Sequence, residues 1–454
     1  MLRRDFVKAL GALALADAIP AQAATPKTFA GLRGSIDASQ HGIRPSSSDD
    51  QSRVFQAILD TASRDDKPVF LPPGTYAVSN IDLPERTRLV GIAGTSRILY
   101  SGNGSLLRGN GCELIDIEGV TLDGANRPFA DDFAGLLHLR GCPRIRVDQC
   151  ELIGSMGTGI SLEVCGGRVE RSRISGAAGV AGLYSVNATG LSVSDNTVAD
   201  CANGGILVHR WDIGADNTMV ANNRVERIAA RGGGTGQRGN GINLFRTEGV
   251  IVSGNHVSDC AFSAIRANSA SNAQITGNTC LRSGETAVYS EFAFQGALIA
   301  NNIIDGGTMG VSIANFNEGG RLAVCANNLI RNMHTDGPYP PEVAGFGHGI
   351  AVEADTAVTG NVVEGAPKFG MLLGWGPYLR NVVVSNNIVR RAGTGLAVTV
   401  VENAGTAVIS NNLFDQVERG GIIGHRWNDP ATRELVGLSR QPFAHLTVER
   451  NRLT

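Results

Sequence analysis

The chain has 454 residues, a formal net charge of −2 and a pI near 6.5. This balance gives no broad basic field for nucleic acid, and without an apolar run of about 18 residues we expect no membrane-spanning helix. The 59 glycines and the 5% share of aromatic residues are not typical of a helical protein.

The first 23 residues have the features of an export signal. The string RRDFVK at 3–8 precedes a moderately apolar stretch, and AQA at 21–23 is typical of a cleavage site. The string resembles the twin-arginine signal, although Leu2 stands where Ser or Thr is more usual. The resemblance implies that the twin-arginine translocation machinery exports the chain to the periplasm or beyond, with no membrane contact after signal removal. An ordinary secretory peptide is the alternative.

A helix and a strand are predicted next. The segment QSRVFQAILDTAS at 51–63 places Val54, Ile58 and Leu59 at helical spacing, and PVFLPPGTY follows at 68–76. Together they resemble the N-terminal cap of the pectate-lyase superfamily, in which one helix and a V-x-L-P-x-G-x-Y strand close the first coil of a right-handed parallel β-helix. This implies three parts, namely the twin-arginine signal peptide 1–23, the cap with the first coils 24–112, and β-helix repeats 113–454.

From Cys150 onward one slot recurs with a mean period of about 27 residues, which is in the range of a solenoid repeat. Cys150 and Ser172 occupy it first, and Asn occupies it in the ten later copies. Every copy has an apolar residue or Cys three positions before the slot and two positions after it. The ten asparagines are Asn196, Asn223, Asn255, Asn278, Asn302, Asn328, Asn361, Asn387, Asn412 and Asn451.

Each unit also contains a Gly followed by alternating apolar residues, as in GISL at 159–162 and GINL at 241–244. A unit therefore reads as a Gly-strand, a Val-strand before the Asn turn, a third strand and a variable loop. Period-two alternation with Gly and Asn at the corners favours strands over helices. The predicted fold is all-β, a right-handed parallel β-helix of about 12–13 three-strand coils with an N-terminal helical cap.

The eight cysteines are interpreted as small core residues, because no CxxC and no Cys/His cluster of metal spacing is present. Cys142 and Cys165 lie in near-equivalent slots of adjacent coils, so that a disulfide between them stays open. We expect no metal and no cofactor. A calcium site would have only Glu353 and Asp355 to draw on, which is weak support.

Three insertions indicate where a ligand would bind. Residues 124–135, 229–240 and 332–348 all lie between a third strand and the next Gly-strand, so they are expected to rise from one edge and wall a groove over the Gly-strands. Alternation predicts which side chains face this groove. On the strands these are Asn243, Arg266, Asn268, Tyr289, Glu291 and Glu353, and at the adjoining corner Arg246, Asn315, Asp355 and Trp375.

Two mechanisms are compatible with this set. Glu291 and Glu353 lie two coils apart, about 9.6 Å at the strand spacing, which suits an inverting hydrolase. For β-elimination, Arg266 would neutralise a uronate carboxylate while Tyr289 or His348 acts as the base. His348 lies in a Gly-His-Gly string reminiscent of polygalacturonase, but the same frame reads Gly-Asn-Gly at 239–241, so its slot is variable.

One string occurs twice, as GGILVHRWD at 204–212 and GGIIGHRWN at 420–428. The copies are eight coils apart and cannot share one site. His209 and Trp211 are candidates for sugar stacking, and the alternative is corner packing in which Arg lies on Trp.

The sequence predicts an exported protein that acts on an acidic, uronate-containing polysaccharide as a lyase, an epimerase or a hydrolase. The alternative is a non-catalytic carbohydrate-binding or structural protein of the envelope or matrix. A mixed polar face exposed only to solvent would look the same in sequence.

Overall fold

The computed structural model describes residues 34–102, 104–129, 135–340, 344–439 and 442–454. The predicted signal peptide lies outside these residues. The chain divides into two units, Met1–Ser35 and Ile36–Thr454, and the second contains every element below. Its described helices include none long and apolar enough to span a membrane.

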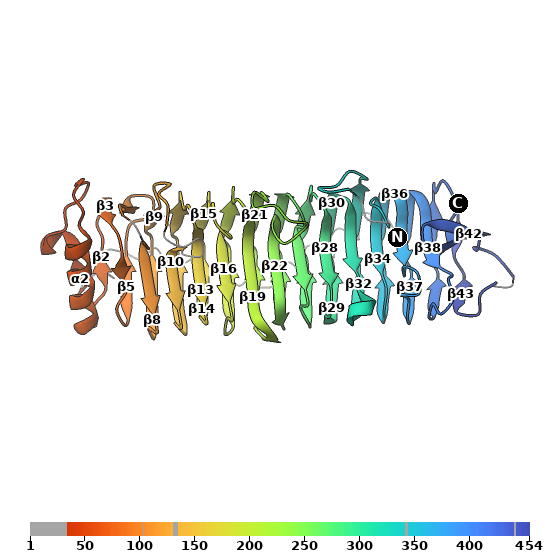
Figure 1. Cartoon of the computed structure of the whole chain (residues 1–454), viewed down its shortest axis with the longest axis horizontal. Helices are drawn as coiled ribbons and strands as arrows, with labels where there is room; N and C mark the ends of the chain where they lie inside the picture. The colour runs from red at the N-terminus through yellow and green to blue at the C-terminus, as the bar shows by residue number, and fades with distance from the viewer. Residues whose placement is uncertain (1–33, 103, 130–134, 341–343, 440–441) are drawn as a thin grey trace, which may run out of the picture. The chain divides into compact units, whose positions relative to one another are not determined.

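The second unit is a solenoid of parallel strands (Figure 1). Each turn contributes a Gly-strand, a Val-strand and a third strand, as predicted, and each strand pairs with its counterpart one turn later. The Val-strands form one 16-stranded sheet, and the other two kinds form a 28-stranded sheet. The described coils extend beyond the expected 12–13 because the coils before Cys150 are regular although they lack the Asn.

The Val-strands are β1 (Ile36–Asp37), β2 (Val69–Phe70), β5 (Thr87–Val90), β8 (Leu114–Glu118), β11 (Arg144–Asp148), β14 (Gly167–Glu170), β17 (Leu191–Ser194), β20 (Met219–Ala221), β23 (Ile251–Ser253), β26 (Ala273–Thr276), β29 (Gln295–Ala300), β32 (Arg321–Ala326), β35 (Thr356–Thr359), β37 (Val382–Ser385), β39 (Ala407–Ser410) and β43 (Leu446–Glu449). The Gly-strands are β4 (Ile81–Asp82), β7 (Leu107–Asn110), β10 (Gly135–Arg140), β13 (Thr158–Glu163), β16 (Leu183–Val186), β19 (Gly204–Ala215), β22 (Asn240–Glu248), β25 (Ile265–Asn268), β28 (Thr286–Glu291), β31 (Met309–Ile313), β34 (His348–Val352) and β41 (Ile422–Arg426).

The third strands are β3 (Gly74–Val78), β6 (Ser96–Tyr100), β9 (Thr121–Asp123), β12 (Glu151–Ile153), β15 (Arg173–Ser175), β18 (Thr197–Ala199), β21 (Arg224–Ile228), β24 (His256–Cys260), β27 (Thr279–Leu281), β30 (Ile303–Gly307), β33 (Leu329–Met333), β40 (Leu413–Asp415) and β44 (Arg452–Leu453). Two long strands, β36 (Val362–Leu373) and β38 (Ile388–Thr399), serve as third strand and Gly-strand in turn. The last described Gly-strand, β41, pairs antiparallel with β42 (Asp429–Glu434).

The predicted inward positions form the core. Ile242, Ile265, Val288, Val311 and Ile350 align across five successive Gly-strands and are all fully buried. Because side chains alternate along a strand, their neighbours in sequence point to the outer face. The predicted register of this face is therefore confirmed.

The recurring asparagines form a buried ladder along one corner. Asn302 is typical, because its Oδ1 accepts hydrogen bonds from the backbone N–H and the Nδ2 of Asn278, at 2.9 and 3.1 Å. Its Nδ2 donates to the carbonyl of Ile275 and to Oδ1 of Asn328, both at 3.0 Å. Each amide thus satisfies backbone groups of the coil before it and continues the chain of bonds to the next. Ser172 begins the ladder by donating its N–H to Asn196.

One helix covers the N-terminal end of the solenoid. Helix α2 (Ser52–Arg64) buries Phe55, Ile58, Leu59 and Ala62 against the first strands, and short 3-10 turns occur at η3 (Ala38–His41) and η4 (Phe316–Glu318). The helix was predicted, and Ile58 and Leu59 are buried as expected, but Phe55 takes the place that was predicted for Val54. Val54 is 37% exposed, whereas Phe55 is fully buried.

All eight cysteines are free thiols and are buried, as expected for core residues. Cys142 and Cys165 are stacked neighbours without a disulfide between them. Burial raises the pKa of the Cys150 and Cys280 thiols to about 12. These thiols are therefore protonated at neutral pH and act as small apolar side chains.

Candidate functional site

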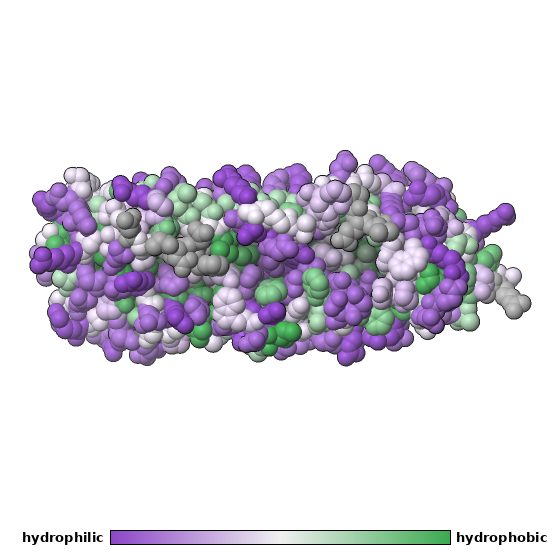
Figure 2. All heavy atoms as spheres, in the orientation of Figure 1, coloured by the Kyte–Doolittle hydropathy of each residue, from purple (hydrophilic) through white to green (hydrophobic). Residues whose placement is uncertain are grey.

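The outer face of the Gly-strands is the face that the loops border. Three loops follow β9, β21 and β33, so all three begin at the corner between a third strand and a Gly-strand. Their described residues are 124–129, 229–239, 334–340 and 344–347. In Figure 1 the third strands run along the upper edge, and the Gly-strands run across the middle of the view. Figure 2 shows the same side as a mainly hydrophilic surface with scattered apolar spots.

Arg266 is the centre of a compact polar cluster on this face. Its Nε and Nη2 donate to the two carboxylate oxygens of Glu291, at 2.6 and 3.0 Å, and Asn268 Nδ2 donates to Oε1 of the same carboxylate at 3.0 Å. Its Nη1 donates to the carbonyl of Gly236 at 2.7 Å and lies 3.9 Å from Glu285. The guanidinium therefore joins the 229–239 loop to β28, and the protein supplies its counterion.

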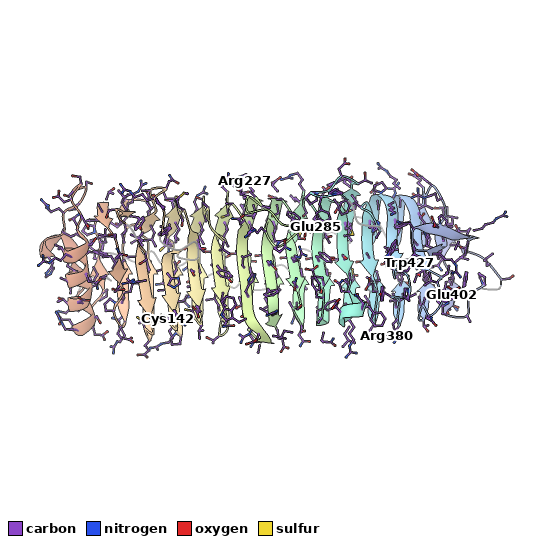
Figure 3. All side chains as sticks on the ribbon, in the orientation of Figure 1. Cys142, Arg227, Glu285, Arg380, Glu402 and Trp427 are labelled. Atoms are coloured by element: carbon purple, nitrogen blue, oxygen red, sulfur yellow. The ribbon has the colours of Figure 1, made fainter. Side chains whose placement is uncertain are left out.

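Glu285 was not predicted as a site residue, because it lies just before β28 and therefore outside the alternating strand positions. It is 2% exposed, and burial raises the pKa of its carboxyl, partly offset by a hydrogen bond from the Tyr339 hydroxyl. Tyr339 packs against Phe262 and Phe346 with ring centroids 6.2 and 5.6 Å away. Tyr339 belongs to the loop that follows β33, so Glu285, which directly precedes β28, anchors this loop over the face (Figure 3).

Asn243, Arg266, Tyr289, Ser312 and Ala351 form one outward row along the axis, as predicted. The Tyr289 ring lies 5.3 Å from the Arg266 guanidinium, a cation–π contact. Asn243 is only 7% exposed. Tyr289 thus supports the arginine from the next coil, and Asn243 is covered.

The second outward row starts aromatic and becomes polar. His209 lies between Tyr184 and Phe245, with ring centroids 5.2 and 5.5 Å away, and Asn268 and Glu291 follow Phe245 in register. His209 is therefore packed between two protein rings, so its faces are not free to stack on a sugar.

Glu353 has a carboxyl on this face whose pKa is near neutrality. Burial raises the pKa of Glu353 to about 7, although Oε2 accepts a 2.6 Å hydrogen bond from the backbone N–H of Phe316. The residue continues the row of Glu291 two coils later, and the coil between them contributes only Ala314. A small side chain therefore separates the two carboxylates.

Asp355 lies at the opposite corner from the loops. Its carboxylate accepts hydrogen bonds from Arg380, including one of 3.1 Å from Nε, and one of 3.0 Å from Asn381. Figure 3 shows Arg380 along the lower edge of the solenoid. Glu353 and Asp355 are thus bonded to separate partners, and no group of three or more His, Cys, Asp or Glu within the described ranges is placed to hold a metal ion.

Arg246 and Asn315 also stabilise this lower corner. Arg246 donates to the carbonyl of Trp211 at 2.6 Å and lies 4.8 Å over the Phe245 ring. Asn315 adopts a left-handed conformation and accepts a 3.0 Å hydrogen bond from the N–H of Phe292 through Oδ1. The guanidinium of Arg246 and the amide oxygen of Asn315 thus stabilise the corner. Neither group is fully available to a ligand.

His348 is enclosed. It is 1% exposed, its ring lies 5.1 Å from that of Phe369, and burial, with the nearby charge of Lys368, lowers its pKa to about 3. A neutral ring sealed from solvent cannot take a proton from a polymer, so we do not assign the role of base to His348.

A patch of aromatic and cationic residues lies toward the C-terminal end of the same face. Trp375 and Trp427 form an edge-to-face pair with centroids 5.5 Å apart, and Trp427 is 47% exposed. Lys368 donates to Asn428 at 2.9 Å, and Arg419 donates to the carbonyl of Lys368 at 2.9 Å. These five residues are called the tryptophan patch, and Figure 3 labels Trp427 within it.

Lys368 and Arg419 carry charges that the described residues do not neutralise. Their hydrogen bonds go to carbonyl, amide and hydroxyl oxygens, and neither forms an ion pair with a carboxylate of the described ranges. Burial and the charge of Arg419 lower the pKa of Lys368. The patch therefore offers a positive potential beside an exposed indole. Lys368 and Arg419 were not predicted as site residues, because they do not belong to the repeat pattern.

Trp211 is separated from the patch by eight Gly-strand pairings, as predicted. It is 55% exposed at the lower corner. Trp211 and Trp427 are each about half exposed, so corner packing and sugar stacking both remain compatible with these rings.

Comparison with known proteins identifies the family. The family model of the right-handed β-helix region matches residues 134–233 and 213–381, together more than half of the chain. The chain belongs to this family. No curated protein matches its sequence.

Solved structures with the same fold are distant in sequence. The catalytic unit of a GH87 α-1,3-glucanase from Streptomyces thermodiastaticus is 16% identical at a TM-score of 0.50, covering 92% of this chain and 69% of the glucanase. The pre-mature gene product 12 of bacteriophage phi29 is 14% identical at a TM-score of 0.54, covering 87% of this chain and 64% of the phage protein. At such identities the likeness shows the fold alone.

Proposed function

We propose that this right-handed β-helix protein is an exported enzyme that hydrolyses an acidic polysaccharide bound along the Gly-strand face. The observation that carries the proposal is Glu353, a partly buried carboxyl on the outer face whose pKa is raised to about 7. A carboxyl of this kind is protonated in a large fraction of molecules at neutral pH. It can therefore act as a general acid.

The proposed step is cleavage of a glycosidic bond. Glu353 gives its proton to the leaving oxygen as the bond to the anomeric carbon breaks, and water adds to that carbon while it loses a proton to the carboxylate of Glu291. Glu291, two coils away at about 9.6 Å, is close to the separation of an inverting pair. Its carboxylate is held by Arg266 and Asn268, which fixes the anion that orients the water.

Hydrolysis is preferred to β-elimination because of the partners of Arg266. Elimination needs a cation free to neutralise the substrate carboxylate, and Arg266 already has two hydrogen bonds to Glu291. Two bases were offered for elimination. His348 is sealed from solvent, and the ring of Tyr289 packs against the Arg266 guanidinium. A lyase or an epimerase would therefore need groups that this cluster does not supply.

The acidic nature of the substrate is inferred from the tryptophan patch. An indole face stacks on the apolar face of a sugar ring, and two cations without carboxylate partners would pair with a carboxylate on that ring. Trp375 follows Gly374, the residue that donates to Val352 beside Glu353, so the patch and the acid share one face. The polymer would run from the patch across Glu353 toward Glu291.

Two further observations support the proposal. One neighbour in fold is named as an α-1,3-glucanase, which places a polysaccharide hydrolase on a similar scaffold. The RRDFVK and AQA strings support export by the twin-arginine route to the periplasm or the outside, where polysaccharides are found. The segments 51–63 and 68–76 resemble the N-terminal cap of the pectate-lyase superfamily, and we propose that the chain is related to it.

The test is turnover on a panel of uronate-containing polysaccharides. We expect new reducing ends without absorbance near 235 nm from unsaturated uronate, and a loss of at least a hundredfold in Glu353→Gln. The matched control is Glu364→Gln, which alters a carboxylate bound to Arg391 on a third strand. Absorbance at 235 nm would show a lyase, and full activity of Glu353→Gln would remove the assigned acid.

A second function is favoured by one observation. Glu291 is 2% exposed and accepts three hydrogen bonds, so its lone pairs are largely used within the protein. A non-catalytic protein that binds the polysaccharide through the tryptophan patch needs no reactive carboxylate. It would bind the panel without releasing sugar ends.

A further inference from the structure

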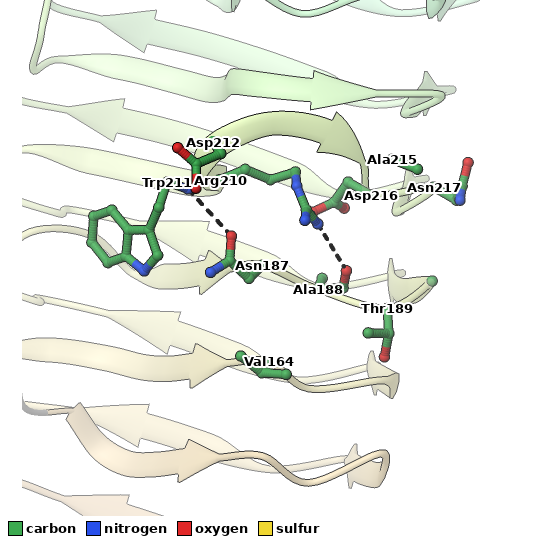
Figure 4. Close-up of a pocket in the computed structure, with 11 residues that line it drawn as sticks. Val164, Asn187, Ala188, Thr189, Arg210, Trp211, Asp212, Ala215, Asp216 and Asn217 are labelled. Atoms are coloured by element: carbon green, nitrogen blue, oxygen red, sulfur yellow. Dashed lines mark hydrogen bonds and ion pairs between the residues drawn. The ribbon is translucent and has the colours of Figure 1, made fainter.

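A second cleft lies away from the Gly-strand face, at the lower corner where β19 turns toward β20 (Figure 4). Its volume is about 620 Å³, which is in the range of small-molecule sites. The lining includes Val164, Asn187, Arg210, Trp211, Asp212 and Asp216.

An insertion in β19 builds one wall of this cleft. The pairing of β19 with β22 jumps from His209 opposite Phe245 to Gly214 opposite Thr247, so four residues face the single Arg246. The bulge projects Trp211 and Ile213, which are 55% and 56% exposed. Bulges of this kind commonly redirect side chains at functional sites.

The floor of the cleft contains an arginine and an aspartate that do not form a direct hydrogen bond. Arg210 Nη1 and Asp216 Oδ2 are 4.0 Å apart, longer than a direct charge-assisted hydrogen bond. Asp216 is 1% exposed, and its Oδ2 and the Nε of Arg210 have no hydrogen-bond partner among the described residues. Leaving such buried groups unpaired is costly. One hydroxyl oxygen with two hydrogen bonds bridges atoms about 4 to 5 Å apart, which fits this gap.

Two more groups complete the chemistry. Asn187 accepts a 3.2 Å hydrogen bond from the N–H of Trp211 through Oδ1, and it lines the cleft with an amide nitrogen that can act as a donor (Figure 4). Asp212 adds a second carboxylate to the rim, so that Arg210, Asp212 and Asp216 sum to one negative charge. This charge repels a uronate, in contrast to the cations of the tryptophan patch.

We propose that this cleft is a separate binding site for a neutral, hydroxyl-rich sugar residue. Trp211 stacks on the ring, a sugar hydroxyl accepts from Arg210 and donates to Asp216, and Asn187 donates to a second hydroxyl. The site goes beyond the proposed hydrolysis, because it lies on another corner and needs no catalytic group. Together with the tryptophan patch it fits a polymer that carries both acidic and neutral residues.

The test measures binding in a variant that retains one indole. The chain has three Trp residues, so Trp375→Phe with Trp427→Phe leaves Trp211 as the only fluorescent indole. Cellohexaose, laminarihexaose and mannohexaose are titrated into this variant, and calorimetry on the unmodified chain gives the affinity. We expect at least one hexasaccharide to change the Trp211 emission with saturation.

Trp211→Ala should weaken that affinity at least tenfold, and Asp216→Asn should weaken it severalfold. The matched control is Ile213→Ala, an equally exposed residue of the same bulge that does not line the cleft, and it should keep the affinity. Thermal melts confirm that each variant is folded. Unchanged affinity in Trp211→Ala, or no binding of any hexasaccharide up to about 10 mM, overturns the proposal. Because the readout is binding, it is independent of whether Glu353 cleaves a polymer.

Discussion

At the scale of single residues, the ladder asparagines show how one side chain specifies a corner. Each amide accepts hydrogen bonds from the coil before it and donates to both the coil before and the coil after it, so the groups that a turn leaves unpaired are satisfied inside the protein. A buried row of hydrogen-bonded amides stabilises the fold most when every member is present, because removing one leaves unpaired groups on both sides.

Asn302→Ala should therefore be more destabilising than the same change at the end of the ladder. We expect a loss of about 3 to 5 kcal/mol at Asn302, because four side-chain hydrogen bonds and their buried partners are affected. At Asn451, which is partly exposed and ends the ladder, about half of this is expected. Urea midpoints followed by circular dichroism compare the two, and equal shifts would argue against a cooperative ladder.

Glu353 predicts a pH dependence of stability. Its pKa is about 7 in the folded chain against 4.5 when exposed, so folding favours the protonated form. The contribution is fully present below pH 4.5 and is lost as the pH rises through about 7. Relative to the unmodified chain, Glu353→Gln should gain up to about 3 kcal/mol between pH 5 and pH 8. Urea midpoints at both pH values measure this, and a pH-independent difference between the two proteins would contradict the assigned burial.

At the scale of elements, the loops and the cap are attached by a few side chains each. Arg266 joins β25 to β28 and to the 229–239 loop, and Tyr339 joins the loop that follows β33 to Glu285. Helix α2 covers the first coil through Phe55 and its neighbours. These contacts lie outside the repeat, so each depends on particular residues.

Arg266→Leu should destabilise the chain and loosen the 229–239 loop. Removing the guanidinium leaves Glu291 and Glu285 buried without a cation, at a cost of about 3 to 5 kcal/mol. The double variant Arg266→Leu with Glu291→Leu should recover part of this loss, because the unpaired charge is gone. Chemical denaturation and limited proteolysis within 229–239 give the two readouts, and wild-type values for Arg266→Leu would mean that the cluster is not structural.

Phe55→Asp should detach the cap, because the side chain is fully buried between α2 and the first strands. The bare sheet edge would then be open to other chains. We expect early proteolysis around 51–65 and self-association in size-exclusion chromatography. Val54→Asp, one residue away but 37% exposed, is the control and should remain monodisperse to the same degree as the unmodified chain. Identical behaviour of the two variants would rule out a capping role for this helix face.

At the scale of the whole solenoid, periodic features could be predicted and aperiodic ones could not. The Asn slot, the inward row and the outward row follow from spacing alone, because register is common to all coils. The contact of Tyr339 with Glu285 joins residues 54 apart in sequence, and it depends on how a long loop folds back. Lys368 and Arg419 have no carboxylate partner among the described residues. The spacing of residues in the sequence cannot predict this, because it depends on which carboxylates lie near them in the fold.

We have proposed that an acidic polysaccharide lies along the Gly-strand face between the tryptophan patch and Glu291, with Glu353 at the bond that is cleaved. A crystal structure of Glu353→Gln with a bound acidic oligosaccharide tests it most directly. We expect sugar rings stacked on Trp427 or Trp375, a carboxylate near Lys368 or Arg419, and a glycosidic oxygen within hydrogen-bond distance of residue 353. An oligosaccharide bound to the Val-strand sheet, or one that leaves this face empty, would contradict it.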